Sequence, residues 1–213
     1  MRHIESDILF GRLKPRERLI EDALMQRLQA KRYVIRQALT ELERMGIVTR
    51  TANRGAAVRD FTTEEVEEIA ELRGVLHRHA VQRIKLPASE ALMARLDTIQ
   101  REHDAAVSAR DPQRIDVANK AFHATIFNAC GSTHLANAIA HYAYLSRAMP
   151  PYPHVDPVLL ETLRGEHWAI IEALRTGDRR ALSRLVVDHI QHSKRIYLAA
   201  RRELPSSAAT RRA

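Results

Sequence analysis

The chain has 213 residues, a formal net charge of +8 and 45% apolar residues, which are dispersed among charged ones. No apolar run reaches the roughly 18 residues that a membrane-spanning helix requires, and charges interrupt the first residues where a signal peptide would have its apolar core, so we expect a cytoplasmic protein that does not enter a membrane. Cys130 is the only cysteine, which excludes an intrachain disulfide, and we expect it to be a small buried residue.

The positive charge is concentrated at the two ends of the chain. Residues 1–60 contain 13 Lys and Arg against 8 Asp and Glu, residues 61–200 contain 17 of each kind, and residues 201–213 contain four against one. A basic segment joined to a neutral one indicates that the first part meets a polyanion. The alternative is that the basic residues serve only solubility.

The first sixty residues combine short helices with a short hairpin. Helices are predicted over 3–10, 21–28 and 33–45, and strands over 46–51 and 56–59. Two short helices joined by a few residues are typical of a helix-turn-helix. The loop between the strands contains Asn and Gly, which is a hairpin signal. The segment therefore predicts a winged helix-turn-helix.

Basic side chains gather where the second helix of this motif begins. Lys31, Arg32 and Arg36 lie at the joint and in the first turn, where a helix N-terminus faces phosphate and side chains enter the major groove. Arginine there can bind guanine through two hydrogen bonds, whereas Lys31 suits a backbone phosphate. On the wing, we expect Arg54, beside Gly55, to reach the minor groove or the DNA backbone. A solvated helix face is the alternative for the arginine pair.

This segment resembles the winged helix-turn-helix of the GntR family of bacterial transcription regulators. The matching positions are Gly11-x-Leu13-x-Pro15, Glu17-x-Leu19, Arg32, Ile35-Arg36, Ala38-Leu39, Leu42, Gly46-Ile47-Val48 and Arg54-Gly55-Ala56. The resemblance implies double-stranded operator DNA as partner, bound through Lys31, Arg32, Tyr33, Arg36, Arg54 and Gly55. Lys31 replaces a small hydroxyl residue of the family and Tyr33 follows it, so we expect an operator sequence that differs from the usual one.

Beyond Phe61, apolar residues recur at three- and four-residue spacing, without convincing alternation. Helices are predicted over about 62–86, 89–109, 112–130, 133–147, 157–176 and 178–201, with a proline-rich loop over 149–153. Short connections between helices favour antiparallel neighbours, so these six helices should form a bundle. Such a bundle has apolar surface to share, and winged helix-turn-helix proteins usually bind two half-sites, so we expect a homodimer.

Three of the eleven histidines lie on or beside faces that should point into the bundle: His123, His167 and His189. Asn119 precedes His123 by one helical turn and projects from the same face. Because a buried imidazole needs a partner, three of them on different helices can share one. A divalent metal bound by three histidine nitrogens and one oxygen meets this need. Three separately hydrogen-bonded histidines are the alternative that spacing leaves open.

The second part resembles the FCD effector domain of the FadR subfamily of GntR regulators. The matching pattern is Asn119-x-x-Phe122-His123, Glu166-His167-x-x-Ile170-x-x-Ala173-Leu174-x-x-Gly177-Asp178-x-x-Ala181 and His189. The resemblance implies a metal, commonly zinc, at Asn119, His123, His167 and His189, and an effector that is often a small carboxylate. Asn119 stands where Asp is frequent, and an amide is a weaker donor. On the following helix, Arg147, His141 and His134 are further candidates for contact with an anionic effector.

The patterns together predict a mainly α protein in three parts. Residues 1–60 are expected to form the winged helix-turn-helix, residues 61–201 an all-helical effector-binding and dimerisation domain, and residues 202–213 a disordered basic tail. We expect a ligand-responsive transcription regulator that acts as a repressor.

Two alternatives remain. The first is a zinc-dependent hydrolase with Glu166 as base, although neighbouring helical residues such as Glu166 and His167 point about 100° apart, and no HExxH motif is present. The second is a constitutive DNA-binding protein with structural histidines.

Overall fold

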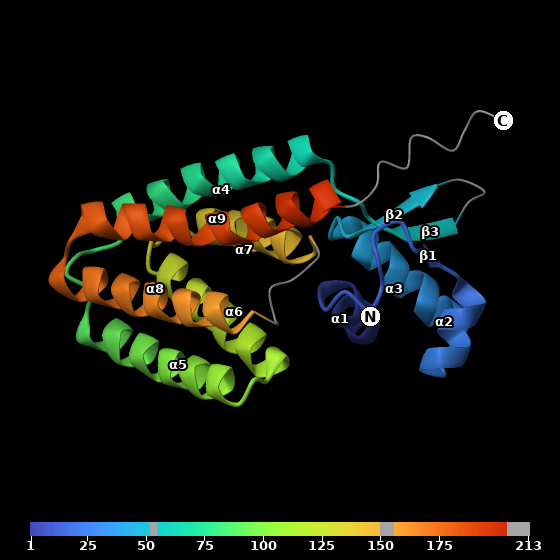
Figure 1. Ribbon diagram of the computed structural model, residues 1–213, viewed down its shortest axis with the longest axis horizontal. Coiled ribbons are helices and arrows are strands. Elements are labelled where there is room, and N and C mark those ends of the chain that lie inside the picture. The colour runs from blue at the N-terminus through green and yellow to red at the C-terminus, as the bar shows by residue number, and fades with distance from the viewer. Residues whose placement is uncertain (52–54, 150–155, 204–213) are drawn as a thin grey trace. The chain divides into compact units, whose positions relative to one another are not determined.

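The computed structural model in Figure 1 describes residues 1–51, 55–149 and 156–203. The chain divides into two compact units. The first contains Met1–Val66 together with segments that begin at Tyr144 and Ser193, and the second contains Glu67–Ala143 and the stretch up to His192.

The first unit contains three short helices and a three-stranded antiparallel sheet. Its helices are α1 (Arg2–Leu9), α2 (Glu21–Leu28) and α3 (Arg32–Arg44), and its strands are β1 (Arg18–Leu19), β2 (Val48–Thr51) and β3 (Gly55–Val58). The strand order is β1-β3-β2, with Ala57 of β3 paired to Arg18 on one side and Thr49 on the other. The winged helix-turn-helix predicted from the sequence is thus confirmed.

An apolar stripe on α3 holds the first unit together. Ile35, Ala38, Leu39 and Leu42 recur at three- and four-residue spacing and are all buried. Leu24 of α2 is buried as well. This stripe fixes the opposite side of α3 as its solvent-exposed face.

The hairpin turns back at Gly55, whose positive φ of 78° favours glycine. Arg54, predicted at the wing tip, lies outside the described residues.

The second part of the chain contains six helices within the described residues, as predicted. They are α4 (Thr63–Arg83), α5 (Glu90–Ser108), α6 (Pro112–Asn128), α7 (Thr133–Arg147), α8 (Pro157–Thr176) and α9 (Arg179–Glu203). Most of the proline-rich segment and the last ten residues lie outside the described part, so the predicted loop and tail stay predictions. No helix of the described residues is both long and apolar enough to cross a bilayer.

Side-chain caps explain where these helices begin. Thr62 and Glu65 form a reciprocal capping box before α4. Ser89 accepts a hydrogen bond from the Leu92 amide, and Asp111 accepts two from the first turn of α6. At the end of α8, Gly177 adopts the left-handed conformation with φ 79°.

The apolar core of the bundle unites residues from all six helices. Its fully buried members include Ala80, Val81, Leu96, Phe122, Ile126, Ile170, Ile171, Leu174 and Leu182. Cys130 is 3% exposed and belongs to this core, as expected. A close-packed interior of this kind fixes the polar groups embedded in it.

Candidate functional site

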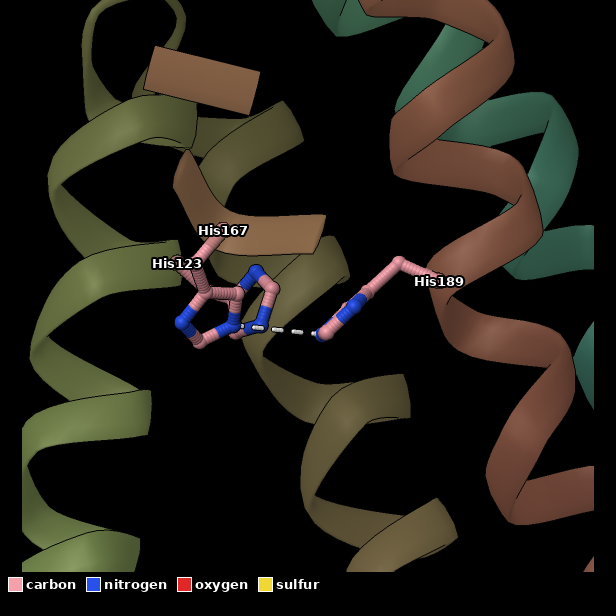
Figure 2. A group of neighbouring side chains, drawn as sticks. All are labelled: His123, His167 and His189. Carbon is pink, nitrogen blue, oxygen red and sulfur yellow. Dashed lines mark hydrogen bonds between the residues drawn. The ribbon is translucent and has the colours of Figure 1, made fainter. Parts of the chain in front are cut away.

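Three histidines from three helices converge inside the bundle. His123 of α6, His167 of α8 and His189 of α9 each bring one ring nitrogen to within 4.8 Å of the others (Figure 2). His167 is fully buried, His189 is 8% exposed and His123 is partly buried. The spacing of the sequence therefore predicted a cluster that the fold assembles.

His167 is oriented by an amide from α5. Its Nδ1 lies 2.9 Å from Oε1 of Gln100. The other end of that amide, Nε2, donates to Oδ1 of Asp104 at 2.9 Å, and Asp104 also accepts from the Trp168 indole at 3.1 Å. Since this arrangement leaves Oε1 of Gln100 as an acceptor, Nδ1 of His167 carries the proton and donates to it.

His189 is oriented by a carboxylate from α8. Its Nδ1 donates to Oε2 of Glu166 at 2.7 Å, and Nε2 of His192 lies 2.7 Å from Oε1 of the same group. A carboxylate that accepts from Nδ1 leaves Nε2 as the free lone pair and raises its basicity as a ligand. Glu166 thus acts through His189.

The two oriented rings leave their Nε2 lone pairs face to face. Nε2 of His167 lies 3.3 Å from Nε2 of His189 (Figure 2), and with both Nδ1 protons committed neither atom can donate to the other. The His123 ring lies 5.2 Å from the His167 ring and 4.9 Å from the His189 ring, between centroids. Lone pairs this close together repel one another, whereas a cation between them would attract both.

Burial keeps these imidazoles neutral. Removal from water lowers the pKa of His123 and of His167 well below the usual histidine value, and protonation of His189 would lower both further. Burial also lowers the pKa of His189, which the hydrogen bond to Glu166 partly opposes. The neutral ring is the form that ligates a metal. Burial raises the pKa of Glu166, but the hydrogen bonds and charge interactions with His189 and His192 together lower it.

Two further buried histidines surround the cluster. His103 is 2% exposed and its ring lies 4.9 Å from that of His167. His77, also 2% exposed, contacts the carbonyl of Val186 at 3.3 Å and the ring of Phe127 at 4.3 Å. Neither histidine, nor Gln100, was predicted from the sequence. The sequence signal that could have indicated them is the pair of polar residues at positions 100 and 103, which lie three apart on the otherwise apolar, buried face of α5.

The other residues predicted around the site lie in different settings. Asn119 is partly buried one turn before His123 on α6. His134 and His141 are exposed on α7, and Arg147 lies in the last turn of that helix. The metal-ligand role of Asn119 and the effector role of the other three stay predictions.

The exposed face of α3 carries the predicted DNA-binding residues. Lys31 is the N-cap residue, and Arg32, Tyr33 and Arg36 are exposed, Tyr33 at 67%. Acidic residues of α2 hold the two arginines. Arg32 lies 2.6 Å from Oδ1 of Asp22, and Nε of Arg36 donates to Oε2 of Glu21 at 2.9 Å.

Two family models match the chain in succession. The model of the bacterial regulatory proteins of the gntR family matches residues 1–58, and the FCD domain model matches residues 68–192, more than half of the chain. This chain belongs to the GntR family of transcription regulators with an FCD domain. Its relatives are regulators and not enzymes, so the choice of a regulator over a hydrolase is confirmed.

Similar proteins support this membership along most of the chain. The HTH-type transcriptional regulator YdhC of Bacillus subtilis is 26% identical over 186 residues, which is 87% of this chain and 83% of YdhC. Among solved structures, E. coli McbR/YncC is 19% identical, with a TM-score of 0.74 over 94% of this chain and 95% of that one. A GntR-type regulator from Rhodococcus sp. RHA1 is 22% identical, with a TM-score of 0.72 over 93% and 95%. Both structures support the fold.

Proposed function

We propose that this GntR-family regulator is a homodimeric repressor whose FCD domain senses a small carboxylate at a divalent metal, most simply zinc. Residues 1–60 would bind operator DNA and residues 61–201 would bind the effector and the second subunit. The observation that carries the proposal is the pair of opposed Nε2 atoms of His167 and His189, 3.3 Å apart.

The donor set fits a zinc-type ion. Three neutral imidazoles, two of them oriented by Gln100 and Glu166, would bind the metal through ring nitrogens, and Asn119 would add an oxygen. Zinc held by these four protein ligands can accept an outside ligand by expanding to five-coordination. When bound, the ion supplies Lewis acidity toward a carboxylate oxygen.

A cation on α4 favours an anionic effector. Arg73 precedes His77 by one turn, so both side chains project from the same face of α4. Its Nε is buried, and its positive charge contributes to the lowered pKa of both His123 and His189. A guanidinium beside a metal site forms strong, directional hydrogen bonds with a carboxylate.

The exposed face of α3 supplies the DNA contacts. Arg32 and Arg36 point to solvent and are held by exposed ion pairs with Asp22 and Glu21, which are weak enough for phosphate or guanine to replace. The effector changes operator affinity only if it favours one dimer geometry over the other.

Metal content and operator binding test this proposal. Protein purified without chelator should contain about one zinc-type ion per chain. His123→Ala should lose it, whereas His134→Ala, which alters an exposed histidine of α7, should keep it. Equal metal content in the two variants would contradict a metal site at His123. Titration of an operator duplex with small carboxylates, with and without EDTA, then tests sensing, and an affinity that no carboxylate changes would contradict it.

A further inference from the structure

A basic groove lies between α4 and α9, apart from the histidine cluster. Figure 1 shows these two helices side by side, and the contact of His77 with the Val186 carbonyl joins them. The residues that line the groove are Arg78, Gln82, Arg179, Arg180, Ser183, Arg184, Val187 and Asp188. Four of them are arginines and one is an aspartate, so the groove carries three net positive charges. None of the three clustered histidines is among them.

Helical spacing brings the polar side chains of the groove together. Arg180, Ser183 and Arg184 recur at three- and four-residue spacing, so they project from one face of α9. Arg78 and Gln82 are one turn apart on α4 and meet them from the other side of the groove. The two helices therefore present donors to the same space.

Arg179 differs from the other arginines because it is used inside the chain. Its guanidinium donates to the carbonyl of Val81 and, at 2.9 Å, to that of Ile84, which satisfies carbonyls at the C-terminal end of α4. The other three arginines of the groove are exposed, and none of them forms an ion pair within residues 1–51, 55–149 and 156–203. Their charge is available to a ligand.

The positive charges at the start of α9 are unfavourable without an anion. Arg180 and Arg184 are one turn apart, and like charges at this spacing repel. Arg180 also lies in the first turn, where the helix dipole disfavours a cation. Asp178 caps the helix by accepting from the Ala181 amide at 2.9 Å, and Asp188 follows Arg184 by one turn, but neither carboxylate forms an ion pair with these arginines in the described part of the chain. An anion in the groove would relieve both effects.

Phosphate is the anion that these donors fit best. Arginine forms two parallel hydrogen bonds with a phosphate, and the Ser183 hydroxyl and the Gln82 amide add neutral donors. A phosphate monoester carries a charge of about −1.5 to −2 at pH 7, which leaves part of the positive charge of the groove unneutralised, whereas two linked phosphates can neutralise all of it. The volume of the groove is about 590 Å³, within the range of about 300–1,000 Å³ that is usual for small-molecule sites.

We propose that the groove between α4 and α9 is a second ligand site, which binds a small molecule with a diphosphate group through Arg78, Arg180 and Arg184. This site goes beyond the metal and carboxylate site proposed above and does not depend on it. The diphosphate belongs either to the free pyrophosphate ion or to a nucleotide. The backbone of duplex DNA is the competing occupant, because it offers the same phosphate oxygens.

Calorimetric titration of the full-length protein with pyrophosphate tests the site. Arg180→Gln combined with Arg184→Gln removes two guanidinium groups at exposed positions, and we expect it to weaken pyrophosphate binding about tenfold or more, because hydrogen bonds between charged groups are the strong ones. The matched control combines Arg101→Gln with Arg114→Gln, which remove the same charge from exposed positions of α5 and α6, and it should bind like the wild type. An equal loss in the two double variants, or no binding by the wild type, would overturn the proposal.

Two single variants locate the bound anion. Arg78→Gln changes the groove from α4 instead of α9, so it should weaken pyrophosphate binding even if the double variant of α9 fails to fold. His123→Ala alters the metal site and should leave pyrophosphate binding unchanged. Wild-type affinity in Arg78→Gln, or a loss of affinity in His123→Ala, would overturn the proposal, the second because the anion would then lie at the metal.

Titrations with ADP and with a DNA duplex of mixed sequence identify the source of the phosphates. Binding of ADP with the affinity of pyrophosphate would support a nucleotide, and binding of pyrophosphate alone would support the free ion. In both cases the α9 double variant should keep its affinity for the duplex. If that variant instead loses duplex binding while pyrophosphate does not bind the wild type, the groove contacts DNA and the proposal is wrong.

Discussion

His167 and His189 direct their Nε2 atoms at each other across 3.3 Å, although the Nδ1 of each ring is bonded to an acceptor elsewhere. Two lone pairs at this separation repel unless a cation lies between them. The residues around the two rings therefore hold these nitrogen atoms close together. Gln100 and Glu166 fix the tautomers in which Nδ1 carries the proton, and the packed core holds both rings in place.

Replacement of the orienting carboxylate should weaken metal binding without removing a ligand. Glu166→Gln loses the charge that holds Nδ1 of His189, and we expect the affinity for zinc to fall about 10- to 100-fold. Glu172→Gln, an exposed carboxylate on the same helix that pairs with Arg175, should leave it unchanged. Competition with a chromogenic chelator measures both. An equal affinity for the two variants would mean that Glu166 does not orient a ligand.

The metal-free protein should lose stability as the pH falls. Burial, with the nearby charge of Arg73, lowers the pKa of His77 to about 3, so the folded state keeps this ring neutral while the unfolded chain takes up a proton below about pH 6.5. The unfolded state therefore binds more protons between these values, and the free energy of unfolding falls by about 1.4 kcal/mol per pH unit for this residue alone.

Urea unfolding in EDTA from about pH 6 to pH 5 tests this effect. His77→Phe should reduce the slope of stability against pH by about one proton. His134→Gln, an exposed control, should match the wild-type slope. A wild-type slope in His77→Phe would show that this ring does not stay neutral in the folded state.

Arg36 should contribute to the choice of operator. Arg36→Ala removes a guanidinium suited to a guanine edge, which costs about 1–3 kcal/mol at its base position, or roughly 5- to 150-fold in affinity. Arg44→Ala removes another exposed arginine at the far end of the same helix, where it pairs with Glu41, and should change little. Fluorescence anisotropy with an operator duplex compares them, and equal losses would assign Arg36 no role in recognition.

We expect Glu21 to compete with DNA for Arg32 and Arg36. Its carboxylate lies 2.9 Å from Nε of Arg36 and 3.4 Å from Arg32, so it must release them when they reach a duplex. Since exposed pairs contribute about 0.2–1 kcal/mol, Glu21→Gln should tighten binding to any duplex by about 1.4- to fivefold. Glu41→Gln, which frees Arg44 instead, is the control. Weaker binding by Glu21→Gln would mean that Glu21 positions Arg36 rather than restraining it.

Elements that depend on local sequence could be predicted, and contacts that depend on packing could not. Asp111, Ser89 and Gly177 are capping residues whose effect is local, so the helix limits agreed with the structure within a few residues. Strand β1 was missed because two residues are too few to show alternation.

In the candidate site, too, some residues could be predicted from the sequence and others could not. His123, His167 and His189 could be chosen because each lies on an apolar face of its own helix. The partners Gln100 and Glu166 come from other helices, 67 and 23 residues away in the chain, so only the packed bundle brings them to the rings. The pairing of Arg36 with Glu21 likewise depends on how α2 packs against α3.

Operator recognition can be tested by selection from a random pool of duplexes with the zinc-loaded full-length protein. We expect enrichment of one recurrent sequence with two related half-sites, bound in a salt-sensitive manner. A small carboxylate should release or tighten this binding, and Arg36→Ala should abolish the enrichment. Recovery of no preferred sequence, with or without metal and carboxylates, would contradict operator recognition by this protein.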